Sequence, residues 1–70
     1  MSRSRAEAEK LLEGQRRAIR EHIDKYNRYE HSYDKDTALK TIRRCQGEIR
    51  DIKSSCNVST SDSWEDTWNP

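Results

Sequence analysis

Apolar residues recur along the first part of the chain with the spacing of an α-helix. They form a stripe that steps by four or three positions at a time. Its members are Ala8, Leu12, Gln15, Ile19, His22 and Tyr26, flanked by Leu11, Ala18 and Ile23. Ser4 and Glu7 have the spacing of a capping box just before the stripe. The pattern therefore predicts an amphipathic helix over about residues 5–28.

A second stripe with the same steps follows later in the chain. It consists of Ala38, Ile42, Cys45, Ile49, Ile52 and Cys56, with Leu39 beside it. Asp34 and Asp36 stand just before it and are suitable N-cap residues. The second stripe predicts a helix over about residues 37–54.

The segment between the stripes decides the architecture. The apolar period fades in "YEHSYDKD", which is polar and has the usual length of a helix–helix connection. We place a turn at about residues 30–35, which predicts an all-α fold, an antiparallel two-helix hairpin. A single bent helix is the alternative, because the segment contains neither Gly nor Pro.

The composition changes after the second stripe. Residues 1–55 carry 14 basic and 10 acidic side chains, whereas residues 56–70 carry three acidic and no basic ones. The segment 56–70 is rich in Ser and Thr and has no period, so we expect a flexible acidic tail, disordered or loosely docked, after a hairpin of residues 1–55. Trp64 and Trp68 lie among its acids and could anchor it on a basic apolar surface of this chain or another. An ordinary solvated terminus is the alternative.

The hairpin has little apolar area to bury. Leu, Ile and Val together number nine, and Phe is absent. A lone two-helix hairpin with so few aliphatic side chains is marginal, so we expect a protein partner, or a second copy in a dimer, to cover its apolar face. The predicted apolar interface consists of Leu12, Ile19, Ile23, Ile42, Ile49 and Ile52.

Arginines are concentrated on both predicted helices. In a hairpin, those of the first helix come level with those of the second, and together they are Arg16, Arg17, Arg20, Arg43, Arg44 and Arg50. Such a cluster could bind an acidic protein surface, the chain's own acidic tail or nucleic acid phosphates, or could simply be solvated. Nucleic acid is the less favoured partner, because acids interleave with the arginines and the net charge is only +1.

The sequence offers no arrangement typical of a catalytic or metal site. His22, His31, Cys45 and Cys56 lack the short paired spacing of zinc ligands. There is no Gly-rich phosphate loop and no cysteine with a predicted base. We therefore expect no enzyme activity, no metal and no cofactor. The cysteines are expected to be small buried thiols, with a bridge between chains as the alternative.

The chain also lacks the segments that direct a protein to a membrane. No run approaches 18 apolar residues, and the start "MSRSRAEAEK" has no apolar stretch typical of a signal peptide. The expected compartment is the cytoplasm; secretion without a signal peptide, or excision from a larger secreted chain, is the alternative.

The stretches "EGQRRAIREHIDKYNRY" and "DKDTALKTIRRCQGEIRDIK" resemble a known class of segment. They are similar to helical hairpins near the ends of bacterial polymorphic toxin chains of the Rhs and contact-dependent systems. The matching residues are Arg16, Arg17, Ile19, Glu21, His22, Ile23, Lys25, Ile42, Glu48 and Ile49. The resemblance implies a bacterial origin and a packing or interaction role beside a toxin, and it identifies no catalytic residue.

Taken together, these patterns predict a small non-enzymatic interaction module. A regulator, adaptor or inhibitor from a bacterium or phage fits them best, with binding through the apolar interface and the arginine cluster. The alternatives are a nucleic-acid-binding protein that uses the arginines and a toxin-associated helical fragment.

Overall fold

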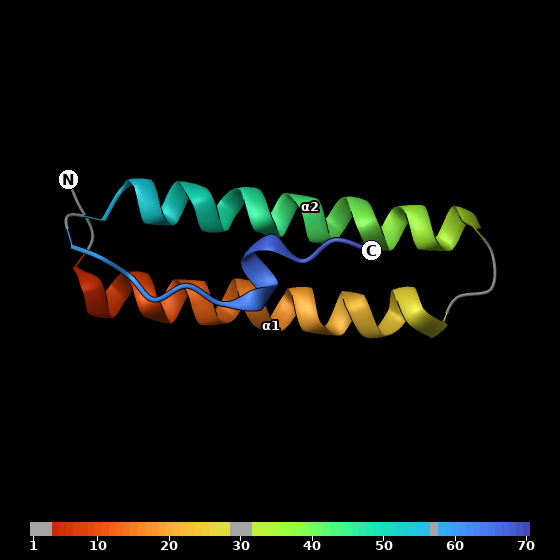
Figure 1. The fold of residues 1–70 in the computed structure, drawn as a ribbon, viewed down its shortest axis with the longest axis horizontal. Coiled ribbons are helices and arrows are strands. Elements are labelled where there is room, and N and C mark those ends of the chain that lie inside the picture. The colour runs from red at the N-terminus through yellow and green to blue at the C-terminus, as the bar shows by residue number, and fades with distance from the viewer. Residues whose placement is uncertain (1–3, 29–31, 57) are drawn as a thin grey trace.

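The computed structural model describes residues 4–28, 32–56 and 58–70, and these residues form an all-α hairpin. Helix α1 spans Arg5–Arg28, helix α2 spans Ser32–Ser54, and a short 3-10 helix, η1, spans Trp64–Thr67. The two long helices lie side by side and antiparallel in a rod about 42 Å long and 15 Å across (Figure 1). The predicted hairpin is therefore confirmed, and the single bent helix is excluded.

Local interactions explain why α1 begins and ends where the sequence predicts. The Glu7 amide donates to the Ser4 hydroxyl at 3.2 Å, and the Ala8 amide donates to the Ser4 carbonyl at 2.9 Å. The first of these bonds satisfies a main-chain donor that the first helical turn leaves free, and the second is the first main-chain bond of the helix itself. Near the other end, Arg28 pairs with Asp24 at 3.1 Å, four positions away, in a solvent-exposed contact that adds a few tenths of a kcal/mol.

Helix α2 begins at Ser32, five residues before the predicted start at residue 37. Asp34, expected to lie near an N-cap, instead falls within the first turn, where a carboxylate interacts favourably with the helix dipole. Lys35 places its ammonium 4.6 Å from the centre of the Tyr26 ring, a cation–π contact that ties this turn to α1. Residues 32–35 of the predicted turn thus belong to α2, and its residues 30 and 31 lie outside the described part of the chain.

The core lies between the two helices and follows both stripes. Its fully or nearly fully buried residues are Ala8, Leu12, Ile19, Ala38, Ile42, Cys45, Ile49 and Ile52. Ala18, Ile23, Cys56 and Trp68 are partly buried and pack against this cluster. The helical period alone identifies most of these positions, because a 3.6-residue repeat puts them on facing sides of an antiparallel pair.

The tail lies against the hairpin and contains a short helix of its own. From the end of α2 it returns along α1, and η1 then carries the chain across to α2, so that Pro70 ends beside α2 (Figure 1). Glu65 in η1 is 3 % exposed, and Trp68 contacts the core. The tail is a docked third element because the hairpin offers cations to its carboxylates and apolar surface to one of its tryptophans.

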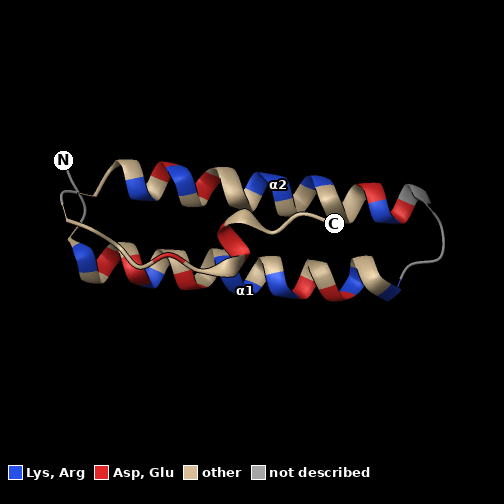
Figure 2. Ribbon diagram, in the orientation of Figure 1, with Lys and Arg blue, Asp and Glu red and all other residues tan. Residues whose placement is uncertain are grey.

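Among the described residues, no helix is both long enough and apolar enough to cross a membrane. Both long helices carry charged side chains along their whole length (Figure 2).

Candidate functional site: the tail-docking face of the hairpin

One side of the hairpin carries polar side chains that bind the tail, and we call four of them, two from each helix, the tail-docking face. They are Arg16 and Arg20 of α1, and Gln46 and Lys53 of α2. In the ribbon coloured by charge, the acidic η1 lies across this side of the basic helices (Figure 2). The face therefore joins residues of α1 and α2 that are 26 or more positions apart in the sequence.

The centre of the face is a buried ion pair between Arg16 and Asp66. Arg16 donates from Nε to Asp66 Oδ1 at 2.8 Å and from Nη2 to Asp66 Oδ2 at 2.7 Å. Nη2 also donates to the Ser61 carbonyl at 2.8 Å. The two charged side chains are only 7 % and 8 % exposed. This two-bond geometry is the one in which a guanidinium binds a carboxylate most strongly.

The surroundings of the Asp66 carboxylate keep it charged. Burial acts to raise the pKa of Asp66, but hydrogen bonds from Arg16 and Lys53 outweigh that effect and lower the pKa from 3.8 to about 2. Its hydrogen bond with Asp66 raises the pKa of Arg16 against the opposing effect of burial. Both partners are therefore held in their ionised forms, and the pair depends on each being present.

Arg20 binds the neighbouring acid of the tail. Its Nη1 donates to Glu65 at 2.7 Å, and its Nη2 donates to Glu13 of α1 at 2.8 Å. Ser63 donates a further short hydrogen bond to the same Glu65 carboxylate. Burial acts to raise the pKa of Glu65, yet these hydrogen bonds lower it overall. Adjacent acids of η1 are thus matched to arginines one helical turn apart on α1.

Gln46 binds the main chain of the tail. Its Nε2 donates to the Glu65 carbonyl at 3.1 Å and to the Trp68 carbonyl at 2.8 Å, and its Oε1 accepts from Arg43 at 3.3 Å. The residue is 3 % exposed. Both the oxygen and the nitrogen of the buried Gln46 amide are hydrogen-bonded. Because the amide binds carbonyl groups, it fixes the backbone of the tail whatever side chains the tail carries.

Lys53, near the end of α2, closes the opposite edge of the face. Its Nζ donates to Asp66 at 2.7 Å and to Asp62 at 2.5 Å. Burial acts to lower the pKa of Lys53, but the hydrogen bonds with these two acids raise it overall. The Asp66 carboxylate consequently lies between cations from both helices, and this arrangement links α1 to α2 through the tail.

The two tail tryptophans play different structural parts. Trp68 packs against the core and meets Tyr26 edge to face, with ring centres 5.9 Å apart and planes at 80°. Trp64 is 57 % exposed. Of the predicted anchor pair, Trp68 is the one that is anchored in this chain, and Trp64 is presented to solvent.

The predicted arginine cluster divides between two environments. Arg16 and Arg20 bind the tail acids, and Arg43 donates to Gln46 and makes a short hydrogen bond to Asn69. The remaining members, Arg17, Arg44 and Arg50, are exposed. Half of the cluster is therefore occupied by the chain's own tail, one of the partners that the sequence suggests.

The predicted apolar interface lies inside the chain. Leu12, Ile19 and Ile42 are 0 % exposed. Ile49 and Ile52 are also buried, and Ile23 is half-buried against the same cluster. Five of the six residues thus have almost no surface to offer a partner, because the hairpin covers one stripe with the other and the tail adds Trp68.

Sequence reasoning named the acidic tail as one possible partner of the arginines, but it missed Gln46 and Lys53 as parts of the site. Arg16 carried a usable signal: it stands four residues after Leu12 and three before Ile19, which places it on the apolar face. An arginine there needs a carboxylate, since buried charges are almost always paired.

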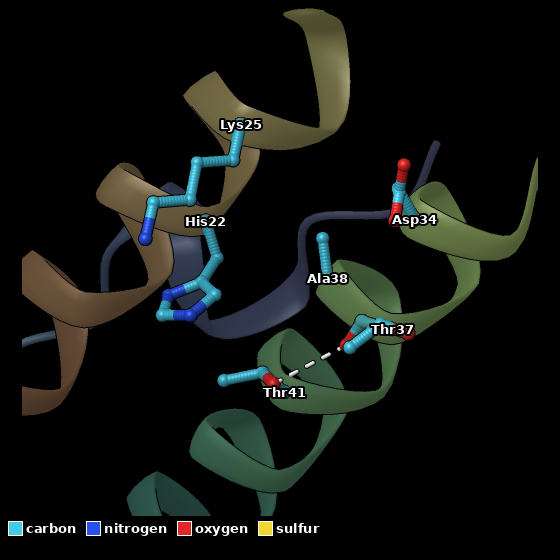
Figure 3. Close-up of a pocket in the computed structure, with 6 residues that line it drawn as sticks. All are labelled: His22, Lys25, Asp34, Thr37, Ala38 and Thr41. Atoms are coloured by element: carbon cyan, nitrogen blue, oxygen red, sulfur yellow. Dashed lines mark hydrogen bonds between the residues drawn. The ribbon is translucent and has the colours of Figure 1, made fainter. Parts of the chain in front are cut away.

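A small hollow lies on the hairpin near the predicted turn. It has a volume of about 130 Å³ and is lined by His22, Lys25, Asp34, Thr37, Ala38 and Thr41 (Figure 3). Thr41 Oγ1 donates to the Thr37 carbonyl at 3.2 Å, and His22 Nδ1 lies 2.8 Å from the Ala18 carbonyl. The hollow is small beside ligand sites of roughly 300–1,000 Å³.

The cysteines and histidines form no metal site among the described residues. Cys45 and Cys56 are free thiols, the first buried and the second half-buried. Burial raises the pKa of Cys45, which keeps its thiol protonated and weakly nucleophilic. Cys45 is thus the small buried thiol that the sequence predicts. Of the two histidines, His31 lies outside the described residues.

Comparisons with protein-family models, with curated proteins and with solved structures find no match to this chain. The resemblance to toxin-associated hairpins therefore stays a prediction from the sequence.

Proposed function

We propose that this chain is a small non-enzymatic interaction module, and that its tail-docking face binds an acidic, tryptophan-containing segment of a protein partner. The observation that carries the proposal is that this face already holds such a segment. The chain's own "SWEDTW" is bound through two arginines, a lysine and a buried glutamine.

The chemistry of the face supports recognition of a particular kind of peptide. Arg16 and Arg20 suit two adjacent carboxylates, while Gln46 binds main-chain carbonyls that any peptide provides. An aromatic residue two positions after the acids would take the place of Trp68 beside Tyr26. A desolvated charge pair next to a packed aromatic ring is typical of the residues that dominate binding energy at protein interfaces.

The proposal changes the binding surface that the sequence suggested. The buried aliphatic stripes serve the core, and the partner instead meets basic and polar groups on one side of the hairpin. A role as regulator, adaptor or inhibitor, a bacterial or phage origin, a dimer and the cytoplasm stay predictions from the sequence.

Nucleic-acid binding has less support. Arg16, Arg20 and Arg43 are engaged by groups of the same chain. Acids alternate with the exposed arginines along both helices (Figure 2), and they would repel phosphates. A short oligonucleotide offered in place of a peptide provides the direct comparison.

The test uses the full chain with its own tail weakened by Glu65→Lys and Asp66→Lys. A fluorescent peptide of residues 61–70 is titrated in, and we expect saturable binding by fluorescence anisotropy. Adding Arg16→Ala should weaken it at least about tenfold, because the paired carboxylate of the peptide loses its guanidinium. Arg17→Ala is the matched control, since Arg17 is exposed and should leave binding unchanged. Equal binding by the Arg16 and Arg17 variants would refute the proposed site.

A further inference from the structure

The segment that fills the tail-docking face belongs to the same chain, and this has a regulatory consequence. We infer that the tail is an intramolecular competitor: it keeps the face closed, and a partner segment with the pattern Trp-acid-acid-x-Trp binds by displacing it. This inference rests on the proposed function, since it requires the face to bind such a segment in trans.

The contacts of the tail are of a kind that lets it undock from the hairpin. Its contacts with the hairpin are mainly charged and polar, through Asp66, Glu65 and the carbonyl of Trp68. The ring of Trp68 provides its large apolar contact with the core, while Trp64 is exposed. An element with few buried apolar contacts opens at a lower free energy than the core does.

The connection to α2 permits this opening without disturbing the helices. Helix α2 ends at Ser54, and Ser61 of the tail donates to Glu9 of α1. Between them, Val58 and Ser59 are exposed and lie outside regular secondary structure. The tail can therefore leave by rotation within this linker, while the hairpin keeps its own core.

The short linker sets how strongly the tail competes. A flexible connection of a few residues gives an effective concentration of about a millimolar. A free peptide of the same sequence must compete with the tail, so its apparent dissociation constant is its intrinsic dissociation constant plus the effective concentration of the tail. The apparent constant is therefore about a millimolar even when the intrinsic binding is tight. A natural partner must exceed the tail in intrinsic affinity or add contacts outside this face.

The experiment lengthens the linker and leaves every contact in place. Inserting about twenty Gly and Ser residues after Val58 should lower the effective concentration roughly five- to tenfold, because that concentration falls as about the −3/2 power of linker length. The labelled peptide of residues 61–70 should bind the insertion variant more tightly than the wild type by the same factor. The Glu65→Lys, Asp66→Lys variant should bind it at least about tenfold more tightly than the wild type.

The outcomes separate the two claims. If the wild type binds the peptide as tightly as both variants do, the tail does not compete and this inference is overturned, while the proposed function stands. If none of the three chains binds the peptide, the proposed function itself fails. Should the charge-reversed chain lose helicity in circular dichroism, the insertion variant decides alone. A doubled mass of the wild type in light scattering, with the tail of one copy cross-linked to another, would overturn the intramolecular assignment.

Discussion

Replacing Arg16 by methionine tests whether the tail is part of the folded structure. Methionine keeps an unbranched side chain of similar length but removes the guanidinium, and with it the two bonds to Asp66 and the one to Ser61. The Asp66 carboxylate would remain nearly buried, and its charge would no longer be balanced by Arg16. The substitution therefore acts on the tail more than on the packing between the helices.

The expected loss follows from what remains around the carboxylate. Removing one partner of a buried ion pair costs about 3–5 kcal/mol when nothing replaces it. Here Asp66 keeps its hydrogen bonds from the Lys53 ammonium at 2.7 Å and from the Ser63 amide at 3.2 Å. We therefore expect a smaller loss of stability than that range, about 2–3 kcal/mol. A 70-residue chain has a total stability of roughly 4–10 kcal/mol, so this is a large fraction of it.

The chain provides two separate probes for the measurement. Both of its tryptophans lie in the tail, so tryptophan fluorescence reports tail docking, while circular dichroism at 222 nm reports the two helices. With a urea slope of about 1 kcal/mol per molar, the fluorescence midpoint should fall by about 2–3 M in Arg16→Met. The dichroism midpoint should fall by the same amount or less.

Arg17→Met is the control, because Arg17 is exposed and an exposed substitution usually changes stability by less than about 0.5 kcal/mol. An Arg16→Met chain that unfolds at the same urea concentration as this control, by both probes, would show that the buried ion pair does not hold the tail.

Three further predictions address the core, the aromatic anchor and the acids. Ile49→Asp should cost about 3–5 kcal/mol of stability and abolish most of the helicity in circular dichroism, because it buries a carboxylate. Leu11→Asp is the control and should keep the helicity, because Leu11 is 43 % exposed. Equal spectra of the two variants would contradict the core assignment. Trp68→Ala should lower the thermal midpoint by about 10 °C or more, and Trp64→Ala, which removes an exposed ring, by only a degree or two; the reverse order would count against the docked tail. Because the pKa of Asp66 is held at about 2, below its ordinary 3.8, its contribution of at most about 2 kcal/mol is complete above about pH 5 and is lost as the pH falls towards 2. Asp66→Asn should flatten that part of the urea-stability profile, and an unchanged profile would argue against the pairing.

Much of the hairpin could be predicted from the sequence, because its causes are local. The bonds of Ser4 that begin α1 involve residues three and four positions apart, and the core positions recur with the helical period. The start of α2 was missed because Asp34 and Asp36 suit both an N-cap and a first turn, and contacts with α1 such as Lys35 on Tyr26 favour the earlier start.

The tail-docking face was decided by the tertiary structure. Arg16 and Asp66 are 50 positions apart, and no period or motif links them; their pairing needs α1, α2 and η1 to be in place together. The Ser- and Thr-rich composition that predicts a disordered or loosely docked tail does not show that its carboxylates meet Arg16, Arg20 and Lys53 in the fold. The sequence by itself therefore determined two helices and the stripes that join them. Only the three-dimensional arrangement determined that the acidic tail fills the basic side of the hairpin, because charge pairing at long range depends on which surfaces the fold brings together.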